Sequence, residues 1–118
     1  MKTLVLGASL NPSRYAYLAI EKLTNHEIPT LAFGLKEGDL FGVHIENKLI
    51  PYTDIDTITL YLNPEKQTKF YDYILSLKPR RVIFNPGTEN PELMKLLEQN
   101  EISYEIACTL VLLSIGQY

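Results

Sequence analysis

Hydrophobic residues occur in two patterns that alternate along this chain. Residues 3–6 form an unbroken apolar or β-branched run, which is typical of a strand buried on both faces of a parallel sheet. Apolar residues then recur every three or four positions, at Ala16, Ala19, Ile20 and Leu23, which is the spacing of one helix face. Runs of the first kind predict further strands over residues 28–33, 57–62, 81–84 and 102–106.

Helix start signals follow several of these predicted strands. Asparagine–proline pairs stand at Asn11-Pro12, Asn63-Pro64 and Asn90-Pro91, where asparagine caps a helix and proline fits its first turn. They predict three helices, and residues 109–115 predict a short last one. Residues 34–52 hold three glycines without helical periodicity, which predicts a long loop with a small hairpin. At most one helical turn is expected at 53–56.

Strands that alternate with helices predict an α/β domain with right-handed crossovers. We expect one Rossmann-like three-layer domain over residues 1–118, with a five-stranded parallel sheet of order 3-2-1-4-5. The first and fourth strands are neighbours in this order, so loops 7–14 and 85–90 would face one crevice. Open α/β sheets bind ligands there, with anions on the free backbone N–H groups of a helix start.

Composition narrows the function classes. The 118 residues are 46% hydrophobic and 21% charged, as in one globular domain. The net charge of −3 and the scattered basic residues disfavour long nucleic acids, although a local patch can still bind a small polyanion. No apolar run reaches the ~18 residues of a membrane helix, and the first strand begins too early for a signal peptide. One cysteine fits a reducing compartment, so we expect a cytoplasmic protein.

The turn after the first strand departs from the dinucleotide fingerprint Gly-x-Gly-x-x-Gly. Only Gly7 is a glycine there, followed by Ala8 and Ser9, so the backbone does not close on a pyrophosphate as NAD requires. After the second strand, Lys36 stands where an acidic residue would hold an unphosphorylated ribose. A lysine attracts a phosphate on that ribose, as in CoA or NADP. A solvated loop lysine without a ligand role is an equally open interpretation.

Three segments resemble a known family. They are Gly7-Ala8-Ser9-x-Asn11-Pro12-x-Arg14, Asn85-Pro86-Gly87-Thr88-x-Asn90 and the single Cys108. Together they resemble the small stand-alone CoA-binding proteins, relatives of the CoA-binding domain in acyl-CoA ligases. The resemblance covers essentially the whole chain and implies a Rossmann-like fold that holds CoA across its strand ends, usually without an assigned activity. Members often carry a turn with proline and asparagine after the second strand, where this chain has Gly34-Leu35-Lys36.

The predicted ligand residues lie in these loops and at their borders. Ser9 and Asn11 are expected to bond phosphate oxygens. Arg14, one turn into the helix, is expected to reach the pyrophosphate in bidentate fashion. Phe33 and Tyr15 are expected to form apolar walls around the adenine, and the glycine of the second loop to take a backbone angle that other residues avoid. The full set is Gly7, Ala8, Ser9, Asn11, Pro12, Arg14, Tyr15, Phe33, Gly34, Lys36, Asn85, Pro86, Gly87 and Thr88.

No set of residues at catalytic spacing is found. His26 and His44 have no histidine, cysteine or carboxylate partner at ligand spacing in the sequence, so no metal is assigned. Cys108 is interpreted as a packing cysteine in preference to the end of a pantetheine site. The leading hypothesis is a module that binds CoA or an acyl-CoA, with its protein partner unknown. The alternatives are an NADP-binding reductase and the nucleotide-binding subunit of an acyl-CoA ligase, which would need a further domain.

Overall fold

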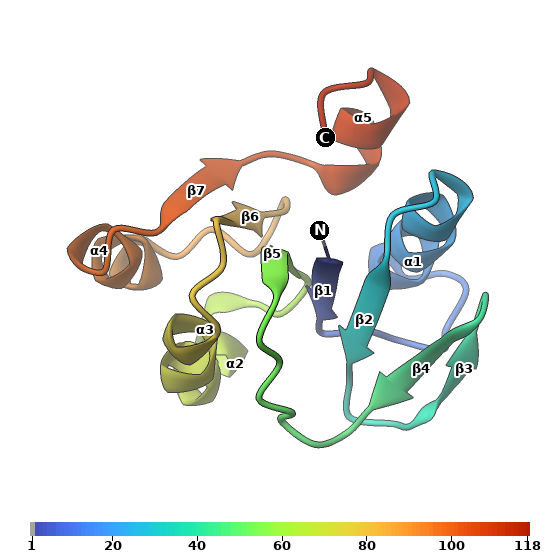
Figure 1. The fold of residues 1–118 in the computed structure, drawn as a ribbon, viewed down its shortest axis with the longest axis horizontal. Coiled ribbons are helices and arrows are strands. Elements are labelled where there is room, and N and C mark those ends of the chain that lie inside the picture. The colour runs from blue at the N-terminus through green and yellow to red at the C-terminus, as the bar shows by residue number, and fades with distance from the viewer. Residues whose placement is uncertain (1) are drawn as a thin grey trace.

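A mostly parallel, seven-stranded sheet forms the centre of the computed structural model, which describes residues 2–118 (Figure 1). The elements in chain order are β1 (Lys2–Leu6), α1 (Tyr15–Asn25), β2 (Thr30–Phe33), β3 (Gly38–Leu40), β4 (Val43–Glu46), β5 (Ile55–Leu60), α2 (Pro64–Gln67), the short 3-10 helix η1 (Thr68–Phe70), α3 (Tyr71–Leu77), β6 (Arg81–Phe84), α4 (Pro91–Gln99), β7 (Ser103–Ile106) and α5 (Thr109–Ser114). The α/β class is therefore confirmed.

The strand number and the strand order differ from the prediction. The observed order is β3-β4-β2-β1-β5-β6-β7, and only β3 runs antiparallel to its neighbour. The predicted hairpin in 34–52 exists as β3 and β4, but β4 also pairs in parallel with β2 and so extends the sheet. It takes the place beside β2 that was assigned to residues 57–62, and β5 lies instead between β1 and β6. The five-strand order 3-2-1-4-5 is therefore wrong.

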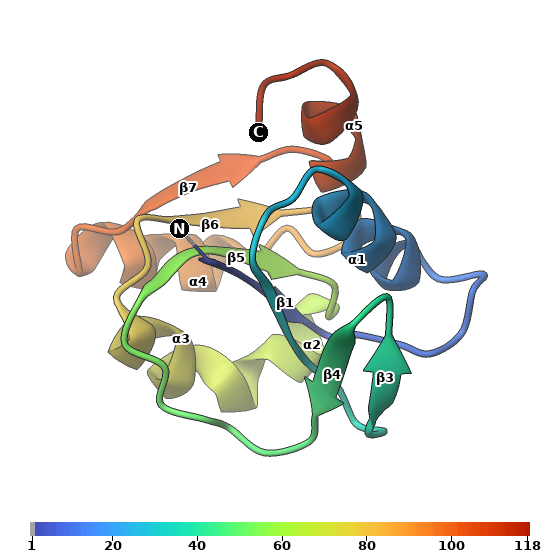
Figure 2. The same ribbon diagram turned by 45° about the vertical axis from the view of Figure 1, so that its right-hand side comes forward.

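Helices cover both faces of the sheet. Figure 2 shows α1 and α5 on one side and α2 and α3 on the other. Val5 on β1 packs in the cluster that holds Ile20 of α1 and Leu113 of α5. Its neighbours Leu4 and Leu6 point to the opposite cluster, with residues of α3 and α4. Because successive side chains of a strand point to opposite faces, an unbroken apolar run is the pattern that this three-layer packing requires.

Two of the three predicted helix starts are confirmed. The Asn63 side chain accepts a hydrogen bond from the Lys66 N–H at 3.0 Å, and Asn90 caps α4 in the same manner. The Asn11 prediction is wrong, because α1 begins only at Tyr15. The Asn11 Oδ1 atom instead accepts the N–H of Ser13 at 3.0 Å and closes a turn before the helix. No helical turn forms at 53–56, where the chain enters β5.

None of the helices in residues 2–118 combines the length and the apolar character that crossing a membrane would need.

Candidate functional site

The carboxyl ends of the parallel strands bring three loops together. β1 has β2 on one side and β5 on the other, so the loop at 7–14 lies between the loop at 34–37 and residues 61–63. The loop at 85–90 follows β6 and is one strand further away. The sequence-based prediction missed residues 61–63, because it did not recognise β4 as a strand of the sheet. The crevice expected at the reversal of strand order therefore lies between β1 and β5.

Two glycines allow these loops to approach closely. Gly7 has φ +103°, and a Cβ atom there would lie 2.9 Å from the carbonyl carbon of Tyr61. At Gly34 a Cβ atom would lie 2.4 Å from the carbonyl oxygen of Ala8. Real Cβ contacts are longer than this, so any other residue at either position would push the loops apart. Both glycines are therefore needed for the shape of the predicted ligand edge.

The backbone N–H groups of the first loop are divided between internal bonds and the solvent. Gly7 and Ala8 both donate to the carbonyl oxygen of Phe33, at 3.0 and 2.8 Å, so neither is free for an anion. For the N–H groups that follow, at Ser9 and Leu10 and in the first two residues of α1, no acceptor is found within residues 2–118. The free amides are therefore in two places: at Ser9 and Leu10 in the loop, and in the first two residues of α1.

Two predicted cations lie at this edge. Arg14 is exposed at the N-cap position of α1, in contrast to the predicted place one turn inside the helix. Lys36 is exposed in the loop after β2. Within the described chain, neither forms an ion pair. Both charges are therefore available to a ligand that carries phosphate groups.

The two predicted aromatic walls differ in exposure. Tyr15 is 71% exposed at the first position of α1, so its ring is accessible to a ligand. Phe33 is only 8% exposed, and its ring packs edge-to-face against Phe70 at a centroid distance of 5.3 Å. The structure thus corrects the expectation for Phe33, whose side chain belongs to the core and offers no wall to an adenine.

The loop after β6 is held by its own side chains. Asn85 is 2% exposed and donates to the Thr59 hydroxyl at 2.7 Å and to the Leu60 carbonyl at 2.8 Å. Its Oδ1 atom accepts the N–H of Thr109 at 2.9 Å. The buried Thr88 hydroxyl donates to the Asn85 carbonyl at 2.8 Å. All polar atoms of the Asn85 side chain are therefore bonded within the fold. Its predicted contact with a ligand could only be a van der Waals contact of the small part of its surface that is exposed.

The exposed tip of this loop is formed by Pro86 and Gly87. The positive φ of Gly87, +90°, confirms the predicted backbone angle. A Cβ atom at this glycine would meet nothing within 4 Å. The backbone angle of the turn therefore favours a glycine here, and crowding by neighbouring atoms does not.

A cavity of about 190 Å³ opens at the same edge, between the start of α1, the ends of β5 and β6 and the start of α5. Its lining residues are Tyr15, Tyr61, Asn85, Pro86, Cys108 and Leu110. Cys108 is half-buried and forms part of this wall, at the N-cap of α5. Within residues 2–118, the buried Tyr61 hydroxyl has no hydrogen-bond partner, although it lies near the Thr59 and Thr109 hydroxyls, which bond each other at 2.7 Å. Burial raises the pKa of Tyr61 to about 12.

Comparison with known proteins shows the family to which the chain belongs. A family model for a CoA binding domain matches residues 1–114. The chain belongs to this CoA-binding domain family. One solved structure, of an uncharacterized protein, is 51% identical to this chain, covers 99% of it and 97% of its own chain, and superposes with a TM-score of 0.96.

Two more distant structures show the same fold. Cell-free ID.343 from Thermus thermophilus shares 23% identity over 99% of this CoA-binding domain and 90% of its own chain, with a TM-score of 0.86. A hypothetical protein from Pyrococcus horikoshii OT3 shares 20% identity over 92% and 78% of the two chains, with a TM-score of 0.82. No curated protein matches the chain.

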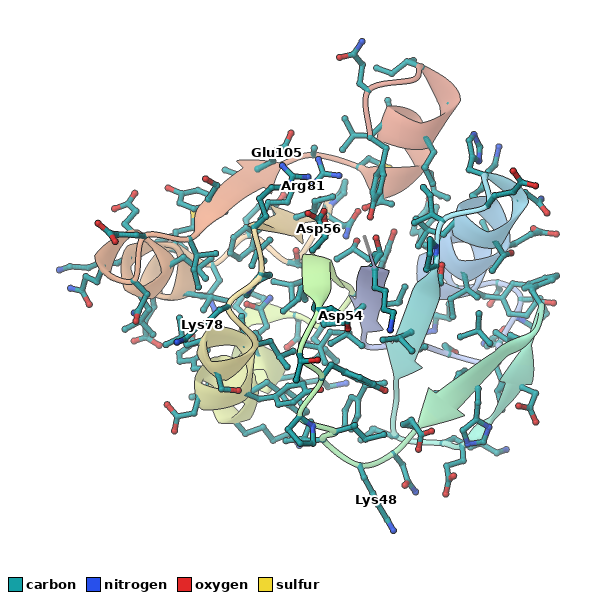
Figure 3. All side chains as sticks on the ribbon, viewed as in Figure 1. Lys48, Asp54, Asp56, Lys78, Arg81 and Glu105 are labelled. Carbon is teal, nitrogen blue, oxygen red and sulfur yellow. The ribbon has the colours of Figure 1, made fainter. Side chains whose placement is uncertain are left out.

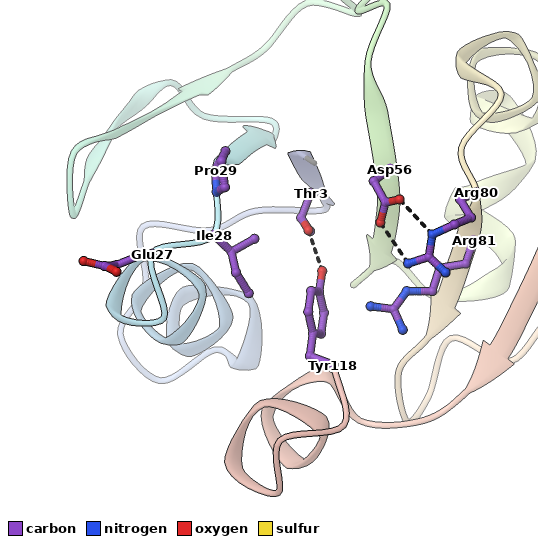
Figure 4. A pocket seen from close by; sticks show the side chains of 8 residues that line it. All are labelled: Thr3, Glu27, Ile28, Pro29, Asp56, Arg80, Arg81 and Tyr118. Carbon is purple, nitrogen blue, oxygen red and sulfur yellow. Dashed lines mark hydrogen bonds and ion pairs between the residues drawn. The ribbon is translucent and has the colours of Figure 1, made fainter.

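A second cavity, of about 250 Å³, lies at the opposite edge of the CoA-binding domain, where the strands begin (Figure 4). Arg80 donates to both carboxylate oxygens of Asp56, at 2.8 and 3.1 Å, and this bond holds the pKa of Asp56 below its usual value. The buried Arg81 donates to Glu105 at 2.7 Å and lies 4.5 Å from the ring centre of Tyr118. Figure 3 shows Asp56, Arg81 and Glu105 around this edge. Because each arginine has a carboxylate partner, we interpret the network as structural.

The β3–β4 hairpin gathers acidic residues around His44. The imidazole bonds Asp39 at 2.9 Å and Glu37 at 3.2 Å, and both bonds raise the pKa of His44. The ligand atoms of Glu37, His44 and Glu46 lie within 4.8 Å of one another, which is close enough to share a metal ion. The prediction that His44 lacks a carboxylate partner is therefore wrong. Strand pairing creates this group, and its negative charge opposes a phosphate near the hairpin.

Proposed function

We propose that this protein holds CoA or an acyl-CoA across the carboxyl ends of β2, β1, β5 and β6, as a binding module without catalysis of its own. The observation that carries the proposal is the first loop. Within the described residues 2–118, it combines unbonded amides at Ser9 and Leu10 with those at the start of α1, beside an Arg14 that forms no ion pair there. Family membership supports CoA as the ligand.

The pyrophosphate is proposed to lie on these amides, where a helix start favours negative charge. The adenosine part then extends over β2, toward Lys36. The pantetheine arm extends to the other side of β1, over the ends of β5 and β6. Ser9 contributes a hydroxyl at this point, although its Oγ atom already accepts the Asn11 N–H at 3.1 Å.

Arg14 is proposed to supply a large share of the affinity. A helix start alone contributes about 0.3–1 kcal/mol for each anionic group. A dissociation constant near 1 μM needs about 8 kcal/mol. A guanidinium group that bonds phosphate oxygens adds charge-assisted hydrogen bonds, which are roughly twice as strong as neutral ones. The Lys36 charge contributes less, because Glu37 and Asp39 lie in the adjacent hairpin.

Calorimetric titration with CoA tests the proposal. We expect Arg14→Ala to weaken binding at least tenfold, about 1.4 kcal/mol, with an unchanged circular dichroism spectrum. Lys22→Ala, an exposed cation in the last turn of the same helix, is the matched control and is expected to bind like the wild type. Equal losses in both variants would remove the specific role of Arg14.

A second titration examines the ribose phosphate. CoA and its form without the 3′-phosphate are compared, and tighter binding of CoA is expected if Lys36 contacts that phosphate. Equal affinities would remove Lys36 from the site. If the wild-type protein bound neither form but bound NADPH, the proposed CoA function would be wrong and a nicotinamide nucleotide would be the ligand.

A further inference from the structure

We propose that the 190 Å³ cavity beside α5 receives the acyl group of a short-chain, uncharged acyl-CoA. This inference rests on the proposed function and specifies its ligand class. A binding module for CoA alone needs no enclosed space beyond the thiol, whereas this domain has a mostly apolar cavity at the edge where the pantetheine arm is proposed to end.

The position of the cavity fits the path of the ligand. Tyr15, the first residue of α1, directly follows the loop at 7–14 and also lines the cavity. Two strand spacings separate β1 from β6, about 10 Å in all, which is a distance that a pantetheine arm spans. A ligand held by its phosphates, with its adenosine over β2, therefore directs its acyl end to the cavity. Lys36 and the cavity lie on opposite sides of β1, as the two ends of such a molecule require.

The chemistry of the wall selects the kind of acyl group. None of the six lining residues carries a charge. Asn85 is the only amide among them, and its polar atoms are all bonded to the protein. A carboxylate at the end of an acyl chain, as in succinyl-CoA, would lose water there without gaining a counter-charge. The cavity therefore favours uncharged acyl groups over acids, and the Tyr61 hydroxyl in its wall has no hydrogen-bond partner within residues 2–118.

The size of the cavity limits the length of the chain. A volume of 190 Å³ holds about six water-sized groups, since water occupies roughly 30 Å³ in the liquid. An acetyl or butanoyl group stays within this number of non-hydrogen atoms, whereas an octanoyl group exceeds it, so the end of an octanoyl chain would extend out of the open cavity. Each buried methylene is expected to improve affinity about fourfold, the equivalent of about 0.8 kcal/mol, until the cavity is full.

Titration of the wild-type protein with a series of ligands tests the inference directly. The probes are CoA, acetyl-CoA, butanoyl-CoA, octanoyl-CoA and succinyl-CoA. Butanoyl-CoA is expected to bind roughly fifteenfold more tightly than acetyl-CoA, because it buries two more methylenes, whereas octanoyl-CoA gains nothing further and succinyl-CoA binds no better than CoA. Equal affinities of CoA and all its thioesters would overturn the acyl cavity and leave the proposed function standing. Failure to bind any of the five would overturn the proposed function itself.

Two substitutions in α5 locate the effect. Leu110→Ala enlarges the cavity and is expected to shift the preferred chain length upward, so that octanoyl-CoA gains at least fivefold relative to butanoyl-CoA. Val111→Ala is the matched control, because Val111 is 52% exposed on the same helix and does not line the cavity. The same chain-length profile in both variants would place the acyl group elsewhere and refute the inference.

Discussion

Gly34→Ala is expected to damage both the fold and the ligand edge through a single contact. The new Cβ atom would lie 2.4 Å from the Ala8 carbonyl oxygen. That oxygen must retreat by at least about half an ångström to reach the shortest contact that real Cβ atoms make. The backbone N–H groups of Ala8 and Gly7 both donate to the Phe33 carbonyl oxygen, so movement of Ala8 stretches these two hydrogen bonds.

The cost follows from these contacts. Two weakened backbone hydrogen bonds are worth about 1 kcal/mol each, and overpacking a tight site costs about 1–3 kcal/mol. We therefore expect the free energy of unfolding to fall by about 3–5 kcal/mol. Because the displaced loop carries the free amides of Ser9 and Leu10, CoA affinity is expected to fall at least tenfold.

Urea unfolding and calorimetric titration measure the two effects. Gly38→Ala is the matched control, since its Cβ atom would approach the Leu10 side chain at 2.6 Å, and a flexible side chain can move aside. We expect that control to lose less than about 1 kcal/mol. The steric reasoning would be refuted if Gly34→Ala unfolded within about 0.5 kcal/mol of the wild type and bound CoA with unchanged affinity.

Other parts of the molecule allow three further predictions. Asn85→Ala removes three buried hydrogen bonds and leaves the N–H of Thr109 without an acceptor, so the free energy of unfolding in urea should fall by about 3 kcal/mol. A fall below about 1 kcal/mol would contradict the structural role of Asn85. Tyr61→Phe removes a hydroxyl without a partner and should leave stability unchanged or raise it by about 1 kcal/mol at neutral pH. In the wild type, the pKa of Tyr61 lies near 12, above its usual 10, so stability falls as pH rises between these values, and Tyr61→Phe should abolish that component in alkaline unfolding curves. The hydrogen bonds from Arg80 lower the pKa of Asp56, so this pair stabilises the fold above the usual carboxyl pKa and loses its effect as pH falls through the lowered pKa. Arg80→Gln should therefore reduce the loss of unfolding free energy at acidic pH. An unchanged pH dependence in urea unfolding would refute the stabilising role of the pair.

Identical local signals had different outcomes in this chain. Asn63 and Asn90 cap helices as predicted, because a capping bond joins residues two or three positions apart. Asn11 precedes a proline in the same way but bonds Ser13 within a turn, and α1 begins at Tyr15. The Asn11 side chain therefore stabilises a local turn and not a helix start.

Strand pairing was the main source of error. The hairpin of β3 and β4 is short and half-exposed, so its hydrophobic pattern is weak, and its pairing with β2 involves only two residue pairs. Missing that pairing displaced β5 in the predicted order and hid residues 61–63 from the site. It also hid the carboxylates that surround His44, since these neighbours meet only when the hairpin closes.

The amino-acid sequence by itself determined most of the strands and helices, that the sheet is largely parallel, and that a small-residue turn follows the first strand. These properties depend on burial and on hydrogen bonds between near neighbours, which leave a periodic pattern along the chain. Tertiary structure alone decided which loops adjoin β1, which amides stay unbonded, that Phe33 and Asn85 face inward, and that a cavity remains beside α5. A hydrophobic pattern records that a residue is buried, but it does not record the residue against which it packs.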